Sequence, residues 1–222
     1  MRTAALVPAR SGSKGIVGKN TRVFHGRPLF AWAVSVGKAT CDAVYLSTDQ
    51  DLEYLAGLYG AGLIHRPAEL ATDDAPMLGV VRHALRAIVE RGSQPPDVMV
   101  ILQPTAPWRT EEHVREALQT LAETGASSVV SLVQLPAHQA PEFIVRLRGD
   151  RVMLPGNGPS RRQDAQPAYV RDGTVYAIRR ETIEEGSLYG KDCRGLIIPR
   201  NQSVTLDSEE DWATAVAGPI AG

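Results

Sequence analysis

Short, uninterrupted apolar runs recur along the chain, separated by stretches with the periodicity of helices. The runs lie at residues 4–7, 44–47, 98–102 and 128–133. Each suits a strand that is buried on both faces of a parallel sheet. Residues 77–91, between two of these runs, carry apolar side chains at helical spacing. Strands alternating with helices predict a doubly wound, Rossmann-like α/β fold, and 222 residues are enough to build it as one domain over residues 1–222.

The other predicted elements continue this alternation. Further helices are expected after Pro28, over residues 51–59, after the N-cap Thr110, and over residues 209–216, where Ser208 and Asp211 form a capping box. Further short strands are expected at residues 63–64, 174–178 and 196–198. These segments extend the same α/β pattern almost to the end of the sequence.

The alternation stops after Leu135. Residues 143–153 alternate around Gly149 and Asp150, a turn signal that predicts a hairpin. Residues 154–166 are rich in Gly, Pro, Arg and Gln and predict a loop. We therefore expect a hairpin or arm at about residues 135–166, outside the regular sheet.

Composition excludes several classes of protein. A formal net charge of −1 argues against a nucleic-acid binder, which usually carries a basic surplus. The sequence contains no apolar run of about 18 residues, so no membrane span is expected. Two cysteines and the lack of a signal-peptide pattern near the start favour a cytoplasmic protein.

A loop rich in glycine and basic residues follows the first predicted strand. Open α/β sheets bind ligands at this position, beyond the carboxyl end of a strand. Gly12, Gly15 and Gly18 allow tight turns that direct backbone amides at phosphate oxygens, and Arg10, Lys14 and Lys19 add positive charge. The glycine spacing fits neither the P-loop nor the dinucleotide fingerprint. The loop therefore predicts a polyphosphate site; a glycine-rich surface turn with solvated cations is the plainer alternative.

Six segments, in order along the chain, resemble the acylneuraminate cytidylyltransferases, or CMP–sialic acid synthetases, which are related to the CMP–Kdo synthetases. They read VPARSGSKGIVGKN from residue 7, STDQ from 47, RPAELATD from 66, LQPTAPWR from 102, RRQDAQPAYVRDGTVY from 161 and TLDSEEDW from 205. The resemblance implies a mixed, mostly parallel sheet and a homodimer with an exchanged arm. It also implies that CTP, with Mg²⁺, donates CMP to a small acidic sugar and releases pyrophosphate.

The resemblance also implies roles for individual residues. The triphosphate would be neutralised by Arg10 and Lys19, which would also act in catalysis, and the nucleotide would be contacted by Ser13, Lys14 and Asn20. Arg66 would lie near cytosine and ribose. The acid would be faced by Gln103 and Arg162, and Mg²⁺ would be held by Asp207. Two of these have plainer interpretations. Arg66 could be a surface residue before Pro67, and Asp207 could merely lead into the helix that Ser208 caps.

The sequence departs from the family pattern at three places, so the resemblance supports the nucleotide half of the site better than the acid half. Thr205 replaces the first carboxylate of the usual Asp-x-Asp, Asp172 precedes Gly173 in place of Asn, and residues 140–143 lack the usual Lys. Two other functions therefore stay open. One is CTP-dependent activation of a different acid, such as a phosphonate in secondary metabolism; the other is a nucleotide-binding module without transferase activity.

Overall fold

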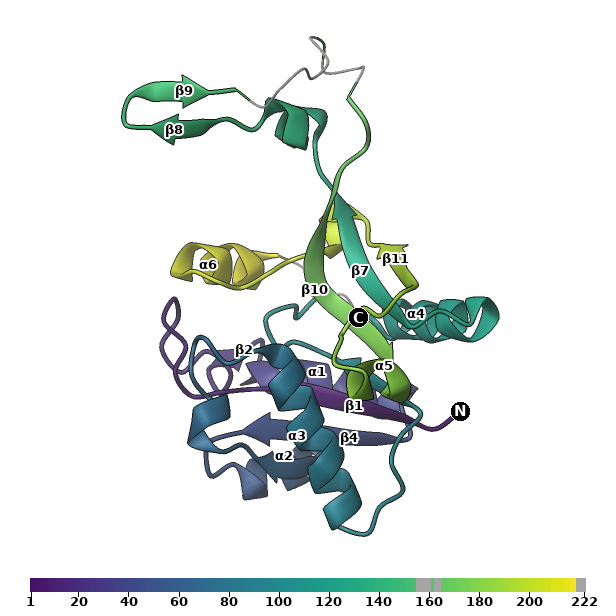
Figure 1. The fold of residues 1–222 in the computed structure, drawn as a ribbon. Helices are drawn as coiled ribbons and strands as arrows, with labels where there is room; N and C mark the ends of the chain where they lie inside the picture. Colours follow the sequence, from purple (N-terminus) through teal and green to yellow (C-terminus); the bar gives the residue numbers. More distant parts are fainter. Residues whose placement is uncertain (155–160, 162–164, 219–222) are drawn as a thin grey trace.

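A computed structural model describes residues 1–154, 161 and 165–218 of the chain. Within these residues, seven strands form one sheet in the order β11-β7-β10-β6-β1-β4-β5 (Figure 1). The strands are β1 (Thr3–Pro8), β4 (Ala43–Thr48), β5 (Gly62–His65), β6 (Val98–Ile101), β7 (Ser128–Gln134), β10 (Tyr169–Arg179) and β11 (Cys193–Ile197).

The sheet is mixed and mostly parallel, as predicted. The pairs β1–β4, β1–β6, β4–β5 and β7–β11 are parallel, whereas β10 runs antiparallel to both β6 and β7. The carboxyl ends of the parallel strands therefore meet at one edge, together with the first residues of β10. In an open α/β sheet this is the edge at which ligands bind.

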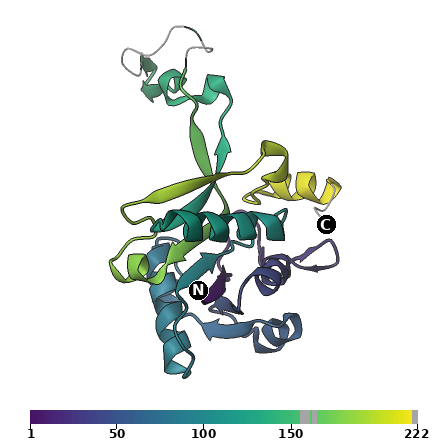
Figure 2. The same ribbon diagram turned by 90° about the vertical axis from the view of Figure 1, so that its right-hand side faces the viewer.

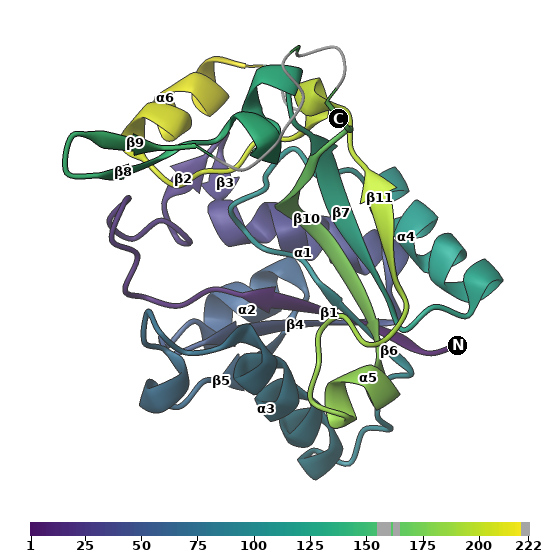
Figure 3. The ribbon, with the colours of Figure 1, turned by 45° about the horizontal axis from the view of Figure 1, so that its top comes forward.

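Helices cover both faces of the sheet (Figure 3). They are α1 (Leu29–Thr40), α2 (Glu53–Tyr59), α3 (Met77–Glu90), α4 (Glu111–Thr124) and α5 (Arg180–Glu184); α6 (Glu209–Ala217) packs in a separate core. Side chains of β1 alternate between two cores: Ala5 and Val7 face the core under α1, α2 and α4, whereas Ala4 and Leu6 face the core under α3 and α5. This alternation explains the uninterrupted apolar run from which the strand was predicted.

A third, smaller core joins the loop after β1 to the last helix. It contains Ile16 from the loop, Phe24 from the short ribbon β2 (Val23–Phe24) and β3 (Arg27–Pro28), and Trp212 from α6. The rings of Phe24 and Trp212 meet edge to face with centroids 5.4 Å apart. Ser208 and Asp211 cap α6 reciprocally, as predicted. This core holds two segments together although about 190 residues separate them in sequence.

Strands β7 and β10 lead away from the sheet into an arm (Figures 1 and 2). Its described part contains the 3-10 turns η2 (Ala137–Gln139) and η3 (Pro141–Phe143) and the hairpin of β8 (Arg146–Arg148) and β9 (Arg151–Met153). The predicted turn at Gly149 is present, but the hairpin is shorter than residues 143–153, because Phe143 lies in η3. Leu147 and Val152 on the hairpin are 69% and 53% exposed.

None of the helices in the described ranges has the length and apolar character that a membrane crossing requires.

Candidate nucleotide-binding site

A cleft of about 380 Å³ lies at the carboxyl edge of the sheet. It is lined by Pro8, Arg10, Ser13, Lys14, Gly15, Lys19, Asn20, Arg66, Met77, Gln103, Pro104, Thr105 and Asp207. All the residues to which the sequence assigned nucleotide or metal contacts are in this set, and so is Gln103. The lining residues come from the ends of β1, β5 and β6, the loop after β1, the start of α3 and the segment before α6.

Hydrogen bonds fix the loop after β1 at several points. The amide of Asn20 donates to the carbonyl oxygen of Arg10 over 2.9 Å and so closes the loop on itself. The backbone N–H of Ser11 donates to Asp49 after β4 over 2.8 Å. Ile16, in the middle of the loop, is fully buried in the third core. The loop is therefore held in place by these bonds and by the burial of Ile16, unlike a turn that lies free on the surface.

Asp73 holds two of the loop's cations. Its carboxylate pairs with the guanidinium of Arg10 and with the ammonium of Lys14, the latter over 2.5 Å. Hydrogen bonds from Lys14 and Arg10 hold the pKa of the Asp73 carboxyl below its usual value. Asp73 therefore provides the negative charge that a phosphate would otherwise supply to these cations.

Lys19 and Asp207 both line the cleft and lie close together. The Lys19 ammonium donates to the carbonyl oxygen of Leu206 over 2.6 Å and lies 3.4 Å from the carboxylate of Asp207. A Cβ added to Gly15 would lie 1.9 Å from the carbonyl oxygen of Asp207. Only glycine lets the loop approach the Asp207 backbone this closely, which explains one loop glycine without invoking phosphate.

Arg66 is 3% exposed, so its interpretation as a surface residue is wrong. Its guanidinium donates to the backbone carbonyl of Ser47 over 2.8 Å and to the Ser47 hydroxyl over 3.2 Å. Burial lowers the pKa of Arg66 to about 10, and the Asp49 carboxylate partly opposes this shift. The side chain therefore forms a rigid wall of the cleft.

A second hollow, of about 330 Å³, adjoins the first and shares Met77 and Gln103 with it. Arg171, Tyr176 and Tyr189 also line it, and the Arg171 guanidinium lies 5.3 Å from the centre of the Tyr189 ring. Burial raises the pKa of the Tyr176 hydroxyl. Arg162, which the sequence assigned to the acid, lies outside the described residues.

The cleft suits a hard cation that arrives with phosphate. Asp207 offers a carboxylate that is 73% exposed, and Mg²⁺ is commonly bound by one or two carboxylates together with substrate phosphate oxygens. The described residues contain no group of three or more His, Cys, Asp or Glu side chains able to hold a metal by themselves. The donor set thus fits Mg²⁺ bound jointly with a nucleotide.

Two of the three departures from the family pattern, Thr205 and Asp172, have side chains that bind other groups of the protein. The Thr205 hydroxyl donates to the backbone carbonyl of Asp172 over 3.2 Å. The Asp172 carboxylate is buried and accepts from the Thr174 hydroxyl over 2.6 Å. The carboxylate thus bonds within the protein, and its charge also helps to raise the pKa of Tyr176, which lines the second hollow.

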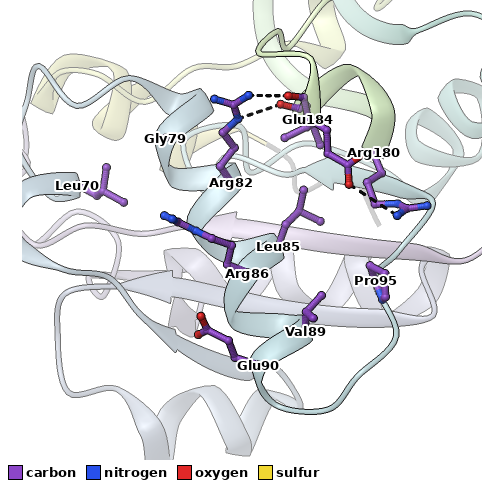
Figure 4. Close-up of a pocket in the computed structure, with 11 residues that line it drawn as sticks. Leu70, Gly79, Arg82, Leu85, Arg86, Val89, Glu90, Pro95, Arg180 and Glu184 are labelled. Atoms are coloured by element: carbon purple, nitrogen blue, oxygen red, sulfur yellow. Dashed lines mark hydrogen bonds and ion pairs between the residues drawn. The ribbon is translucent and has the colours of Figure 1, made fainter.

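A larger hollow, of about 830 Å³, lies between α3 and α5 and differs in character (Figure 4). Leu85, Val89 and Ile183 form much of its wall. Two of its three arginines are engaged: Arg82 donates to the carbonyls of Ile183 and Glu184, and Arg180 pairs with Glu184 (Figure 4). This largely apolar hollow suits a polyphosphate less well than the cation-lined cleft does, so volume alone does not identify the site.

Comparison with known proteins agrees with this geometry. A family model described as cytidylyltransferase matches residues 4–191. The chain belongs to the cytidylyltransferase family. An N-acylneuraminate cytidylyltransferase from Oncorhynchus mykiss is 33% identical over 96% of this chain and 49% of its own length. A CMP-N,N'-diacetyllegionaminic acid synthase from Legionella pneumophila is 30% identical over 96% of this chain and 94% of its own length.

A solved structure shares the fold. The structure of a CMP:2-keto-3-deoxy-manno-octonic acid synthetase complexed with CTP superposes with a TM-score of 0.74 at 16% identity and covers 98% of both chains. The chain spans about half the length of several relatives, including the one from Oncorhynchus mykiss, but nearly the full length of the one from Legionella pneumophila.

Three residues that bind groups in or beside the cleft were not assigned roles from the sequence. Asp49 follows β4 and Asp73 follows β5, and both lie inside segments that carry the family resemblance. Each binds a residue of the loop after β1. Arg109 ends the segment LQPTAPWR and is 5% exposed. The sequence shows only that Arg109 is a charged residue between the apolar run 98–102 and the N-cap Thr110. This position does not indicate which groups its side chain binds.

Proposed function

We propose that the chain transfers CMP from CTP to a small acidic sugar of the sialic or ulosonic type. The observation that carries the proposal is the direct junction, at Gln103, between a cation-lined cleft and a second polar hollow. The names of the two sequence relatives, which cover 96% of this chain, support both the nucleotide and the class of acid.

In the proposed reaction a sugar hydroxyl oxygen attacks the α-phosphorus of CTP, the bond to pyrophosphate breaks, and the hydroxyl proton is lost to water. Arg10, Lys14 and Lys19 neutralise the triphosphate, and Ser13 and Asn20 contact the nucleotide. Asp207 would hold Mg²⁺, which supplies charge neutralisation on the phosphate oxygens when bound. Catalysis then consists mainly of charge stabilisation and alignment.

The second hollow is proposed to bind the acid. Arg171 lies in it with Tyr176 and Gln103, so it combines one cation with hydrogen-bonding groups, as a carboxylated sugar requires. Arg162 remains a proposed contact to the same acid. We also propose a cytoplasmic setting, in which the free thiols of Cys41 and Cys193 would stay reduced.

A pyrophosphate-release assay with CTP and a panel of acids tests this function. Release with a sialic or other ulosonic acid supports it. Pyrophosphate release only with a phosphonate would show that the substrate belongs to a different class of acid, while CMP transfer from CTP would stand. CTP binding without release with any acid would leave a nucleotide-binding module and overturn the proposal.

We expect CTP to bind more tightly than ATP, GTP or UTP, because a rigid polar wall leaves buried groups unpaired beside the wrong base. Arg66→Met should weaken CTP binding by at least about tenfold, the scale of a lost hydrogen bond to a charged group. Arg91→Met is a matched control, because Arg91 likewise donates to a strand carbonyl, that of Leu63 on β5, and does not line the cleft. Equal calorimetric affinities for all four nucleotides would refute base selection.

We expect a homodimer that buries the arm, residues 135–166, against a second copy. Leu147 and Leu154 are 69% and 79% exposed, and a short hairpin has too little core to be stable alone. Light scattering should give a dimer mass that Leu147→Glu reduces to that of a monomer. Leu58→Glu is the control, since Leu58 on α2 is 63% exposed but outside the arm. An active wild-type monomer at micromolar concentration contradicts this expectation.

A further inference from the structure

Strand β10 is interrupted at residues 172–174, beside the junction of the two hollows. Its register with β7 shifts between Arg171 and Tyr176, and Gly173 has a φ of +78°. The backbone N–H of Val175 donates to the Ser131 hydroxyl over 2.8 Å in place of a regular ladder partner. This segment, called the bulge here, needs bonds from outside the ladder to hold its shape.

Arg109 supplies those bonds. Its guanidinium donates to the carbonyl of Thr174, to the carbonyl of Gly173 over 3.4 Å and to the carbonyl of Gln103 over 2.7 Å. The side chain is 5% exposed, and burial lowers the pKa of Arg109 to about 9, while the charge of Asp172 opposes the shift. One buried cation thus joins the end of β6 to the bulge in β10.

The bulge in turn contacts groups that line the site. A Cβ on Gly173 would lie 2.8 Å from the side-chain oxygen of Gln103, so the bulge backbone rests against that side chain. The carbonyl of Asp172 accepts a hydrogen bond from the Thr205 hydroxyl over 3.2 Å. Asp207 lies two residues after Thr205 in the same segment. Displacing the bulge would therefore move Gln103 and loosen the segment that carries Asp207.

We propose that Arg109 is a positioning residue that holds Gln103 and the bulge in register and so aligns the acid hollow with the nucleotide cleft. Arg109 lines neither hollow, so it acts through these contacts and not by touching substrate. The inference rests on the proposed function, because alignment matters only if an acid and a nucleotide react across the junction.

Arg109→Lys tests the proposal, since lysine keeps the charge but cannot reach three carbonyls with a planar fork. Arg179→Lys is the matched control: Arg179 donates to the carbonyls of Ala126 and Leu121 over 2.8 and 2.9 Å, away from both hollows. We expect both variants to lower the melting temperature. Only Arg109→Lys should lower kcat/KM for the acid, by at least about tenfold, with the Kd for CTP within about twofold.

Two further measurements separate positioning from folding. Amide exchange at Val175 should accelerate in Arg109→Lys and stay unchanged in Arg179→Lys. Gly173→Ala should reproduce the loss in kcat/KM, and the double variant should lose less than the product of the two single effects. If Arg109→Lys does not fold, Gly173→Ala alone must show the loss.

Each result bears on one proposal. Equal kcat/KM in Arg109→Lys and Arg179→Lys, or unchanged kinetics in Gly173→Ala, overturns the positioning role while leaving the transferase intact. Unchanged Val175 exchange in a folded Arg109→Lys overturns it as well. Absence of pyrophosphate release from the wild type with every acid overturns the proposed function, and Val175 exchange still decides whether Arg109 holds the bulge.

Discussion

Arg10→Ala and Lys19→Ala should each lower kcat by at least about 100-fold, the scale for losing one donor that stabilises developing charge. The Lys19 side chain is only 12% exposed, so its charge acts where water screens it weakly. Arg10 lies at the carboxyl end of β1, beside the fixed amides of the loop. The measurement is the rate of pyrophosphate release at saturating CTP and magnesium.

Two exposed cations elsewhere serve as controls. Lys38→Ala removes an exposed lysine on α1, and Arg194→Ala removes an arginine whose side chain is 51% exposed and pairs with Asp192. Both variants should keep kcat within about twofold, because exposed charges are screened by solvent and interact only weakly with other groups of the protein. Near-normal rates in both Arg10→Ala and Lys19→Ala would remove the loop from catalysis.

Asp207→Asn should lower activity by at least about 1000-fold, because charge stabilisation by a bound metal amounts to several kcal/mol. Leu206 is fully buried, whereas Thr205 and Asp207 are exposed, so the two polar side chains leave the same side of an extended segment. Thr205→Asp should therefore add a second carboxylate and lower the magnesium concentration for half-maximal rate. Magnesium titrations of the three proteins measure both effects.

Glu210→Gln is the control for Asp207→Asn, since it removes an exposed carboxylate from the first turn of the neighbouring helix α6. It should leave the magnesium titration unchanged. If Asp207→Asn itself titrates as the wild type does and turns over normally, Asp207 only leads into α6 and the metal is held elsewhere.

Local pattern was enough to predict most of the fold. The apolar run 4–7 became β1, residues 77–91 became α3, and Thr110 caps α4 through the backbone N–H of His113. These features depend on neighbours within a few residues. The loop after β1 could likewise be placed, because a glycine-rich turn after a buried strand has a fixed position in this architecture.

Features that depend on distant partners could not be predicted. Strand β10 was expected only at residues 174–178, because the bulge at Gly173 interrupts its apolar pattern, although the strand begins at Tyr169. Its antiparallel direction is not encoded locally. Helix α5 was missed because five residues are too few for a periodicity. The partners of Arg109 and Asp73 lie on other elements, so spacing in the sequence does not identify them.

The pairing of Asp73 with Arg10 and Lys14 changes how a triphosphate would enter the cleft. Without this carboxylate the neighbouring cations of the empty loop would repel one another and spread apart. With it, the loop keeps its shape before the nucleotide arrives, so less ordering is left for the binding step. Binding would then be an exchange of anions, in which phosphate oxygens replace the Asp73 carboxylate on cations that already lie together.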